Sequence, residues 1–184
     1  SNHIVCTNHY QSECFEHDEY NQENIATSDS PYRYQRIEEL IAELSPLSPS
    51  DAVSILRNRH GIEGEDIGLS NEKSVNQFIA HHSVVFQPEK LRMMISTSPW
   101  QLGEFVCYDL NRVFSLKPNE ATMFASPELN IEADSSAIAD ECQRVVRYRE
   151  QYVDFRDAIE AGRTISHEDI NSFINNNPNY FQVY

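Results

Sequence analysis

The stretch FIAHHSVVFQPEKLRMMIS, residues 78–96, decides the fold class of this chain. Phe78 to Phe86 and Leu91 to Ser96 are both apolar, β-prone runs, and the short segment between them contains Pro88. Two such runs joined by a short turn predict an antiparallel hairpin. Residues 105–110 have the same character and predict a third strand.

Helical patterns lie on both sides of these strands. Residues 32–44 carry apolar residues at helical spacing, and Ser48, Pro49 and Asp51 predict a capped helix start, with Gly61 at the exit of that helix. A long helix is expected from Asp134 or Ser135 to Ala161, and a short one from Ser166 through Ile174. Strands grouped between runs of helices favour an α+β fold over a wound parallel sheet.

The remaining segments complete the expected architecture. Ile4, Val5 and Cys6 are β-prone and predict a strand that ends in Thr7-Asn8-His9-Tyr10, whereas the polar residues 11–31 predict a long surface loop. Three or four strands form an incomplete sheet for the apolar residues available. We therefore interpret the chain as part of a larger sheet whose other strands lie on another segment.

Composition excludes several classes of protein. The 184 residues include 29 acidic and 14 basic side chains, for a net charge of −15, which disfavours binding to nucleic acids and to anionic membranes. No apolar run is long enough to span a membrane. The four cysteines form no CxxC pair, and no HExxH motif or P-loop is present. We therefore expect no metal and no cofactor.

Two polar residues are candidates for a site. Asn8 at a strand end could direct its side-chain N–H at a developing oxyanion, or it could close a turn. Arg33 at a helix entrance could hold a carboxylate or polarise a nucleophile's surroundings, or it could pair with surface acids. His81 and His82, in a predicted strand, would point to opposite faces and are expected to be structural.

Several segments together resemble one known family. Four segments are similar, in this order, to motifs of the acyl-CoA:6-aminopenicillanic acid acyltransferase-like family. They are Val5-Cys6-Thr7-Asn8-His9-Tyr10, Tyr32-Arg33-Tyr34-Gln35-Arg36, Ser83-Val84-Val85-Phe86-Gln87-Pro88-Glu89-Lys90, and Pro99-Trp100-Gln101-Leu102-Gly103-Glu104-Phe105 with Tyr108-Asp109-Leu110. These proteins are N-terminal-nucleophile hydrolases, distantly similar to choloylglycine hydrolases. The resemblance covers residues 4–110, so we expect a family-like part over 1–115 and a helical C-terminal extension over 116–184, within one domain or its C-terminal part.

The resemblance implies a fold and a chemistry. The fold would be part of an αββα sandwich, and the nucleophile would be a cysteine freed by self-cleavage, with its own α-amine as general base. Asn8 matches the asparagine that helps form the oxyanion hole. Arg33 matches the arginine near the nucleophile, with Arg36 as the alternative register. Cys6 lies within the asparagine motif and is interpreted as structural, so the nucleophile is expected on an upstream segment.

We therefore predict the C-terminal portion of a cysteine amidohydrolase or acyltransferase that acts on non-peptide or small amide bonds. Its expected partners are an upstream segment or subunit of the same precursor and a small-molecule amide or acyl substrate. The alternative is a non-catalytic acidic α+β module that binds a ligand or a partner protein. An upstream segment that bears a cysteine would distinguish the first prediction from the alternative.

Overall fold

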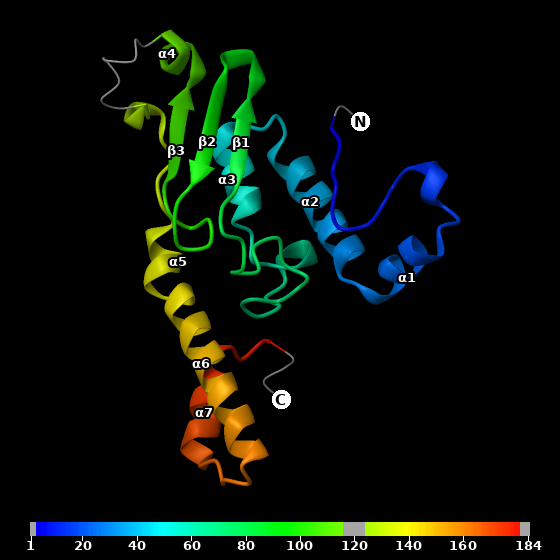
Figure 1. The fold of residues 1–184 in the computed structure, drawn as a ribbon, viewed down its shortest axis with the longest axis vertical. Helices are drawn as coiled ribbons and strands as arrows, with labels where there is room; N and C mark the ends of the chain where they lie inside the picture. Colours follow the sequence, from blue (N-terminus) through cyan, green and yellow to red (C-terminus); the bar gives the residue numbers. More distant parts are fainter. Residues whose placement is uncertain (1–2, 116–123, 181–184) are drawn as a thin grey trace. The chain divides into compact units, whose positions relative to one another are not determined.

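The structure, a computed structural model, describes residues 3–115 and 124–180. Helices and one antiparallel sheet of three strands build it, so the predicted α+β class is confirmed. The chain divides into two compact units, Ser1–Gln77 and Phe78–Tyr184 (Figure 1). The division expected at residue 115 stays a prediction, and residues 116–123 of the expected extension lie outside the described residues.

The first unit is helical. It contains α1 (Glu19–Thr27), α2 (Ser30–Leu44) and α3 (Pro49–Leu56), with 3₁₀ turns at Glu13–Phe15 and Ile62–Gly64. The predicted helices correspond to α2 and α3, and Ser48 and Asp51 form the predicted capping box, in which Ser48 Oγ accepts a hydrogen bond from Asp51 N at 3.2 Å. α3 ends at Leu56, so the prediction that Gly61 marks its exit is wrong.

The prediction of a surface loop over residues 11–31 is also wrong, because α1 lies within it. Asp18 caps this helix, since its carboxylate accepts a hydrogen bond from Asn21 N at 2.8 Å. α1 buries a single residue, and that residue is the polar Asn21. A helix without a buried apolar stripe carries no periodic signal, which explains why the sequence pattern did not reveal it.

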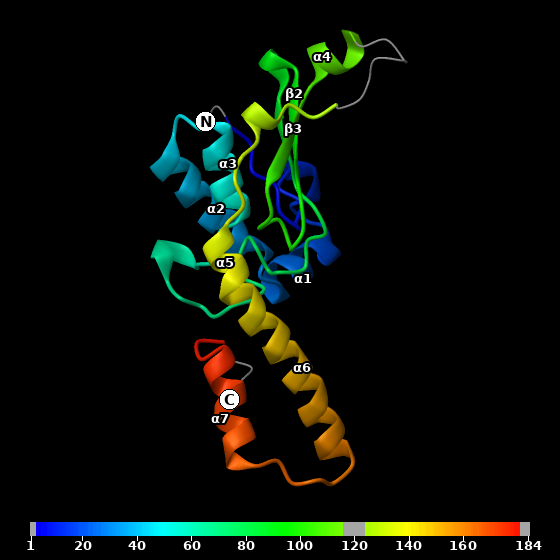
Figure 2. The same cartoon turned by 90° about the vertical axis from the view of Figure 1, so that its left-hand side faces the viewer.

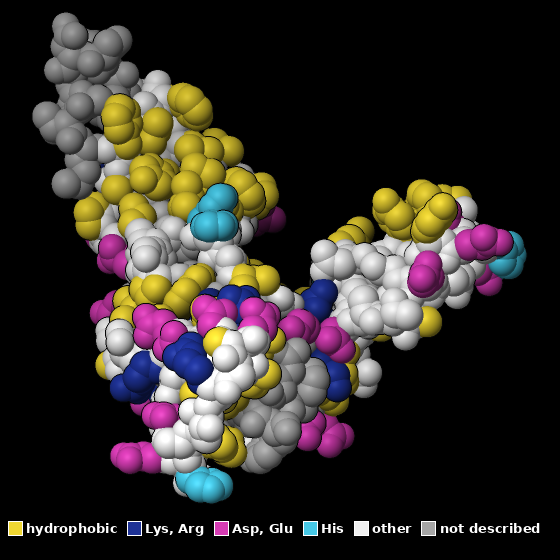
Figure 3. Space-filling view, turned by 60° about the horizontal axis from the view of Figure 1, so that its bottom comes forward, with side chains coloured by type: hydrophobic (Ala, Val, Ile, Leu, Met, Phe, Trp, Pro, Cys, Tyr) yellow, Lys and Arg dark blue, Asp and Glu magenta, His cyan; other side chains and the backbone are white. Residues whose placement is uncertain are grey.

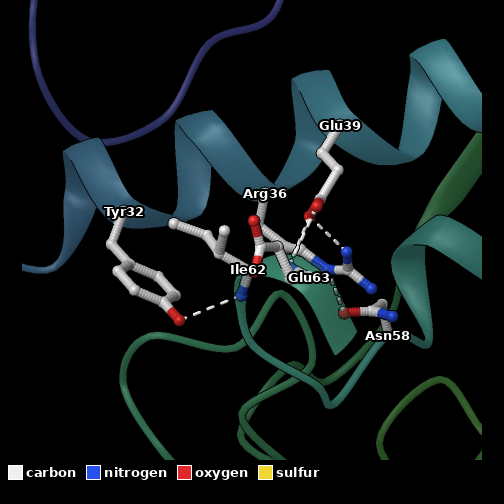
Figure 4. Close-up of polar contacts among 6 residues, drawn as sticks. All are labelled: Tyr32, Arg36, Glu39, Asn58, Ile62 and Glu63. Carbon is white, nitrogen blue, oxygen red and sulfur yellow. Dashed lines mark hydrogen bonds and ion pairs between the residues drawn. The ribbon is translucent and has the colours of Figure 1, made fainter. Parts of the chain in front are cut away.

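A polar network ties the loop after α3 to α2 (Figure 4). Arg36 is 5% exposed; its guanidinium pairs with Glu39 and donates a hydrogen bond to Asn58 Oδ1 at 3.4 Å. Both carboxylate oxygens of Glu39 accept from Glu63 N, at 2.9 and 3.1 Å. The hydroxyl of Tyr32 accepts from Ile62 N at 2.9 Å. These bonds satisfy backbone donors in a segment that has no ladder of its own.

The second unit contains the sheet. Its strands are β1 (Val84–Gln87), β2 (Arg92–Ser96) and β3 (Phe105–Asp109), in the order β1-β2-β3, and a 3₁₀ turn at Pro88–Lys90 joins the predicted hairpin. The predicted first strand is too long. Phe78 is fully buried with φ +54°, a left-handed conformation that a strand does not contain, and His81 and His82 lie outside β1, so strand alternation does not place them.

One face of this sheet is apolar and incompletely covered. The register places Val84, Ile95 and Val106 in one row and Phe86, Met93 and Tyr108 in the next, all on the same face. We call these residues the open face; each is half-buried or exposed, and Phe86 is 64% exposed. Figure 3 shows hydrophobic side chains gathered over this part of the molecule, at the upper left.

The opposite face of the sheet is buried. Met94 is 4% exposed, and Phe105 and Cys107 are fully buried. An antiparallel sheet with one face in water normally alternates apolar and polar side chains along each strand. Here the open face is apolar instead of polar, which is the pattern of a face that is covered.

The described residues of the second unit form four α-helices: α4 (Leu110–Ser115), α5 (Ser135–Ala139), α6 (Glu141–Glu160) and α7 (His167–Asn176). The predicted long helix is confirmed apart from a break at Asp140 between α5 and α6, and Asp134 and Ser166 cap α5 and α7 as expected. α6 and α7 form a hairpin (Figure 2) around Tyr148, Phe173 and Tyr180. No helix in the described ranges could span a membrane.

The close packing of Gly61, in the loop after α3, against Tyr32 of α2 can be tested. A Cβ at this position would meet the Tyr32 hydroxyl and would lie 2.8 Å from Ile67 Cγ2. We expect Gly61→Ala to lower the free energy of unfolding by about 1–3 kcal/mol, the usual cost of overpacking, as measured by urea denaturation. Combined with Tyr32→Phe, which removes the clashing hydroxyl, Gly61→Ala should cost less than it does alone; equal costs would contradict this close approach.

Candidate functional site

The segment Thr7-Asn8-His9-Tyr10 lies against the N-terminal part of α2, but it is not the end of a strand. Residues 3–11 contain no strand, so the prediction for Ile4, Val5 and Cys6 is wrong. Val5 is buried, 6% exposed, and the residues after it are held by hydrogen bonds from side chains. The β-prone composition of residues 4–6 therefore reflects the burial of Val5, and these residues form no β-ladder.

The structure brings Asn8 and Arg33 together. Arg33 Nη2 donates a hydrogen bond to Asn8 Oδ1 at 2.7 Å, and Nη1 donates to the backbone carbonyl of Glu72. Burial lowers the pKa of Arg33 from its ordinary value, while the carboxylates of Asp29 and Glu72 raise it. An arginine remains charged across the accessible pH range, so the contact with Asn8 is charge-assisted.

This contact determines how the amide of Asn8 is oriented. A guanidinium offers only donors, so it selects the oxygen of the amide, and the NH₂ group must then point elsewhere. Asn8 is exposed, and Nδ2 has no hydrogen-bond partner within the described part of the chain. The contact with Arg33 fixes the orientation of the amide and leaves its N–H available to another group. A donor of this type can stabilise an oxyanion.

A second set of polar contacts anchors the residues on either side of Asn8. Ser30, which is fully buried at the start of α2, lies with its Oγ 2.8 Å from His9 Nδ1 and 3.0 Å from Thr7 Oγ1. Thr7 Oγ1 also donates to the carbonyl of Ser30 at 3.1 Å. Ser30 was not predicted to be part of the site, although it lies only two residues before the motif that contains Arg33.

The two arginines of the motif have separate roles. Arg36 packs against Glu39 and Asn58 in the network that holds the loop after α3, whereas Arg33 contacts Asn8. Of these two arginines, Arg33 is therefore the one that lies beside Asn8.

The cysteines do not pair with one another. All four are free; Cys6 and Cys14 are exposed, and Cys107 and Cys142 are buried. Burial raises the pKa of the Cys107 and Cys142 thiols, which makes them poor nucleophiles at neutral pH. Within residues 3–115 and 124–180, no group of three or more metal-ligating side chains lies close enough together to hold a metal ion.

Comparison with known proteins gives one match. A family model described as acyl-coenzyme A:6-aminopenicillanic acid acyl-transferase matches residues 1–98, more than half of the 184 residues. The matched range includes Asn8, Arg33 and the hairpin of β1 and β2. No curated protein and no solved structure matches the chain.

The separation of the two arginines predicts different effects on stability. We expect Arg36→Met to lower the free energy of unfolding by about 1–3 kcal/mol, because it removes a buried donor and leaves its partners unsatisfied. Arg33→Met should cost about 1 kcal/mol or less, because its contacts are exposed. Urea denaturation of both variants measures this difference, and a larger loss for Arg33→Met would contradict the assignment.

Proposed function

Since this chain belongs to the acyl-coenzyme A:6-aminopenicillanic acid acyl-transferase family, we propose that it is the C-terminal portion of a cysteine N-terminal-nucleophile enzyme. The enzyme would hydrolyse small or non-peptide amide bonds or transfer their acyl groups. The observation that carries the proposal is the hydrogen bond between Arg33 and Asn8, which leaves the amide N–H of Asn8 free to act as a donor.

In the proposed reaction, self-cleavage frees the α-amine of a cysteine. The thiol of this cysteine attacks the carbonyl carbon of the substrate, and its α-amine takes up the thiol proton. The carbonyl oxygen becomes an oxyanion, which Asn8 Nδ2 stabilises. When the intermediate collapses, the C–N bond breaks, and the α-ammonium returns the proton to the leaving amine. Water then hydrolyses the thioester, or an amine accepts the acyl group. Arg33 touches neither substrate nor nucleophile in this scheme and acts through Asn8.

We place the nucleophile on an upstream segment of the same precursor. Cys6 is exposed, but it follows Val5 in the chain and therefore has no free α-amine, and the residues around it belong to the segment that presents Asn8. Ser30 is fully buried beside His9, so its hydroxyl is not accessible to a substrate. These observations favour a division of the site between two segments.

The open face of the sheet supports the same proposal from the second unit. An apolar face with no charged side chain among its six residues is suited to packing against another sheet, which lies about 10 Å away in such arrangements. Exposed apolar patches of this kind mark interaction surfaces. We propose that strands of the upstream segment cover the open face, which would complete the sandwich expected from the sequence.

The role of Asn8 predicts a specific loss of activity. In the protein expressed from its complete gene, we expect Asn8→Ala to lower kcat on acyl p-nitroanilides by about 100- to 1,000-fold, the usual effect of removing one oxyanion donor. Gln35→Ala removes an amide from the exposed side of α2 and serves as the matched control.

Intact mass spectrometry of the same preparation tests the nucleophile. A co-purifying piece, or a longer chain, with a cysteine that has become N-terminal is expected. If no such cysteine exists, or if Asn8→Ala retains full activity, the catalytic proposal fails, and the acidic binding module becomes the better description.

The open face predicts where the upstream segment binds. With the two segments expressed as separate polypeptides, Phe86→Lys should weaken their association by at least 10-fold, because it places a charge in an apolar interface. Glu89→Lys introduces the same residue in the exposed turn after β1 and should leave association unchanged. Equal affinities of the two variants, measured by calorimetry, would exclude the open face as the contact surface.

A further inference from the structure

Asn21 is a buried polar residue on a helix that buries no apolar side chain. It is 5% exposed and is the one residue that α1 buries, whereas Tyr20 beside it is 84% exposed. Surface helices normally bury an apolar stripe, and asparagine is rarely buried unless its amide is satisfied. The position of Asn21 must therefore be explained by its hydrogen bonds.

These hydrogen bonds hold the backbone of Tyr10 at both ends. Asn21 Oδ1 accepts from Tyr10 N at 2.9 Å, and Asn21 Nδ2 donates to the Tyr10 carbonyl at 3.0 Å. The pair reproduces what a neighbouring strand supplies to one residue of an antiparallel ladder. Because Asp18 caps the backbone N–H of Asn21, the first turn of α1 fixes the position from which the amide reaches Tyr10.

Tyr10 lies two residues after Asn8 and directly after His9, and its backbone is held by a different helix from the one that holds His9. Thr7 and His9 are bound to Ser30 of α2, the side chain of Asn8 is bound to Arg33, and Tyr10 is bound to Asn21 of α1. The ring of Tyr10 also stacks on Phe15, with centroids 4.3 Å apart. The segment that contains Asn8 is therefore held by hydrogen bonds from both α1 and α2.

We propose that Asn21 is a positioning residue of the site: by clamping the backbone of Tyr10, it holds Asn8 Nδ2 where the oxyanion forms. This inference rests on the proposed role of Asn8. In this proposal, α1 holds the amide of Asn21 against the backbone of Tyr10, which explains why the residue that this helix buries is polar. A displacement of about 1 Å in such a donor can cost as much as 100-fold in rate.

The clamp can be measured without any substrate. Amide hydrogen exchange by NMR should show Tyr10 N–H protected in the unmodified protein and exchanging at least 10-fold faster in Asn21→Ala. Asn24→Ala, which removes a half-buried amide one turn later on the same helix, is the matched control and should not change this rate. Unchanged exchange in Asn21→Ala would overturn the clamp itself.

The positioning role requires a kinetic test on the protein from the complete gene, with acyl p-nitroanilides as the probe. We expect Asn21→Ala to lower kcat by about 10- to 100-fold with little change in KM, because substrate binding is retained while orientation is lost. In an Asn8→Ala background, the same substitution should have almost no further effect on kcat, since Asn21 acts through Asn8. A multiplied loss in the double variant would show a general structural effect and would overturn the inference.

Two further measurements keep the outcomes separate. If Asn21→Ala fails to fold, Asn21→Gln keeps both the acceptor and the donor of the amide but displaces them by one methylene group, and it should show an intermediate loss of kcat. If Asn8→Ala alone leaves kcat unchanged, the proposed function of Asn8 is wrong, whereas a loss in Asn8→Ala with full activity in Asn21→Ala would reject only the role of Asn21.

Discussion

The guanidinium of Arg33 is the group on which the orientation of the Asn8 amide depends. One of its nitrogens reaches Asn8, and the other reaches the backbone of Glu72. Residues near the start of the unit and near its end are thereby bound to the same side chain of α2. Because the group has donors only and keeps its charge, it also decides which end of the Asn8 amide remains available.

The elements that the sequence predicted well are those with a strong local signal. The capping box at Ser48, the apolar stripe of α2 and the two runs on either side of Pro88 each specify their structure within a few residues. The strand predictions were wrong at Val5 and Phe78, which are buried apolar residues outside any strand. The helix α1 was not predicted, because the residue that it buries is polar. In those places tertiary contacts outweigh local composition.

The candidate site was predicted from a resemblance to known motifs and not from a local sequence pattern. Asn8 and Arg33 were identified through a resemblance between motifs, since neither residue carries a local pattern that distinguishes it from a turn or a surface ion pair. Their contact at 2.7 Å could not be inferred from a separation of 25 residues. Ser30 and Asn21 were missed because a side chain that binds backbone or another side chain across a turn has no periodicity that a sequence could display.

The polar character of α1 has a thermal consequence. Segments with little buried apolar surface open at a small fraction of the free energy needed for global unfolding, and α1 buries no apolar side chain. On warming, the helix that supplies Asn21 would detach while α2 and α3 remain folded. If Asn21 positions Asn8 as we propose, the site is lost at a lower temperature than the fold, and a melting curve recorded on the whole chain would overstate the range over which the site is intact.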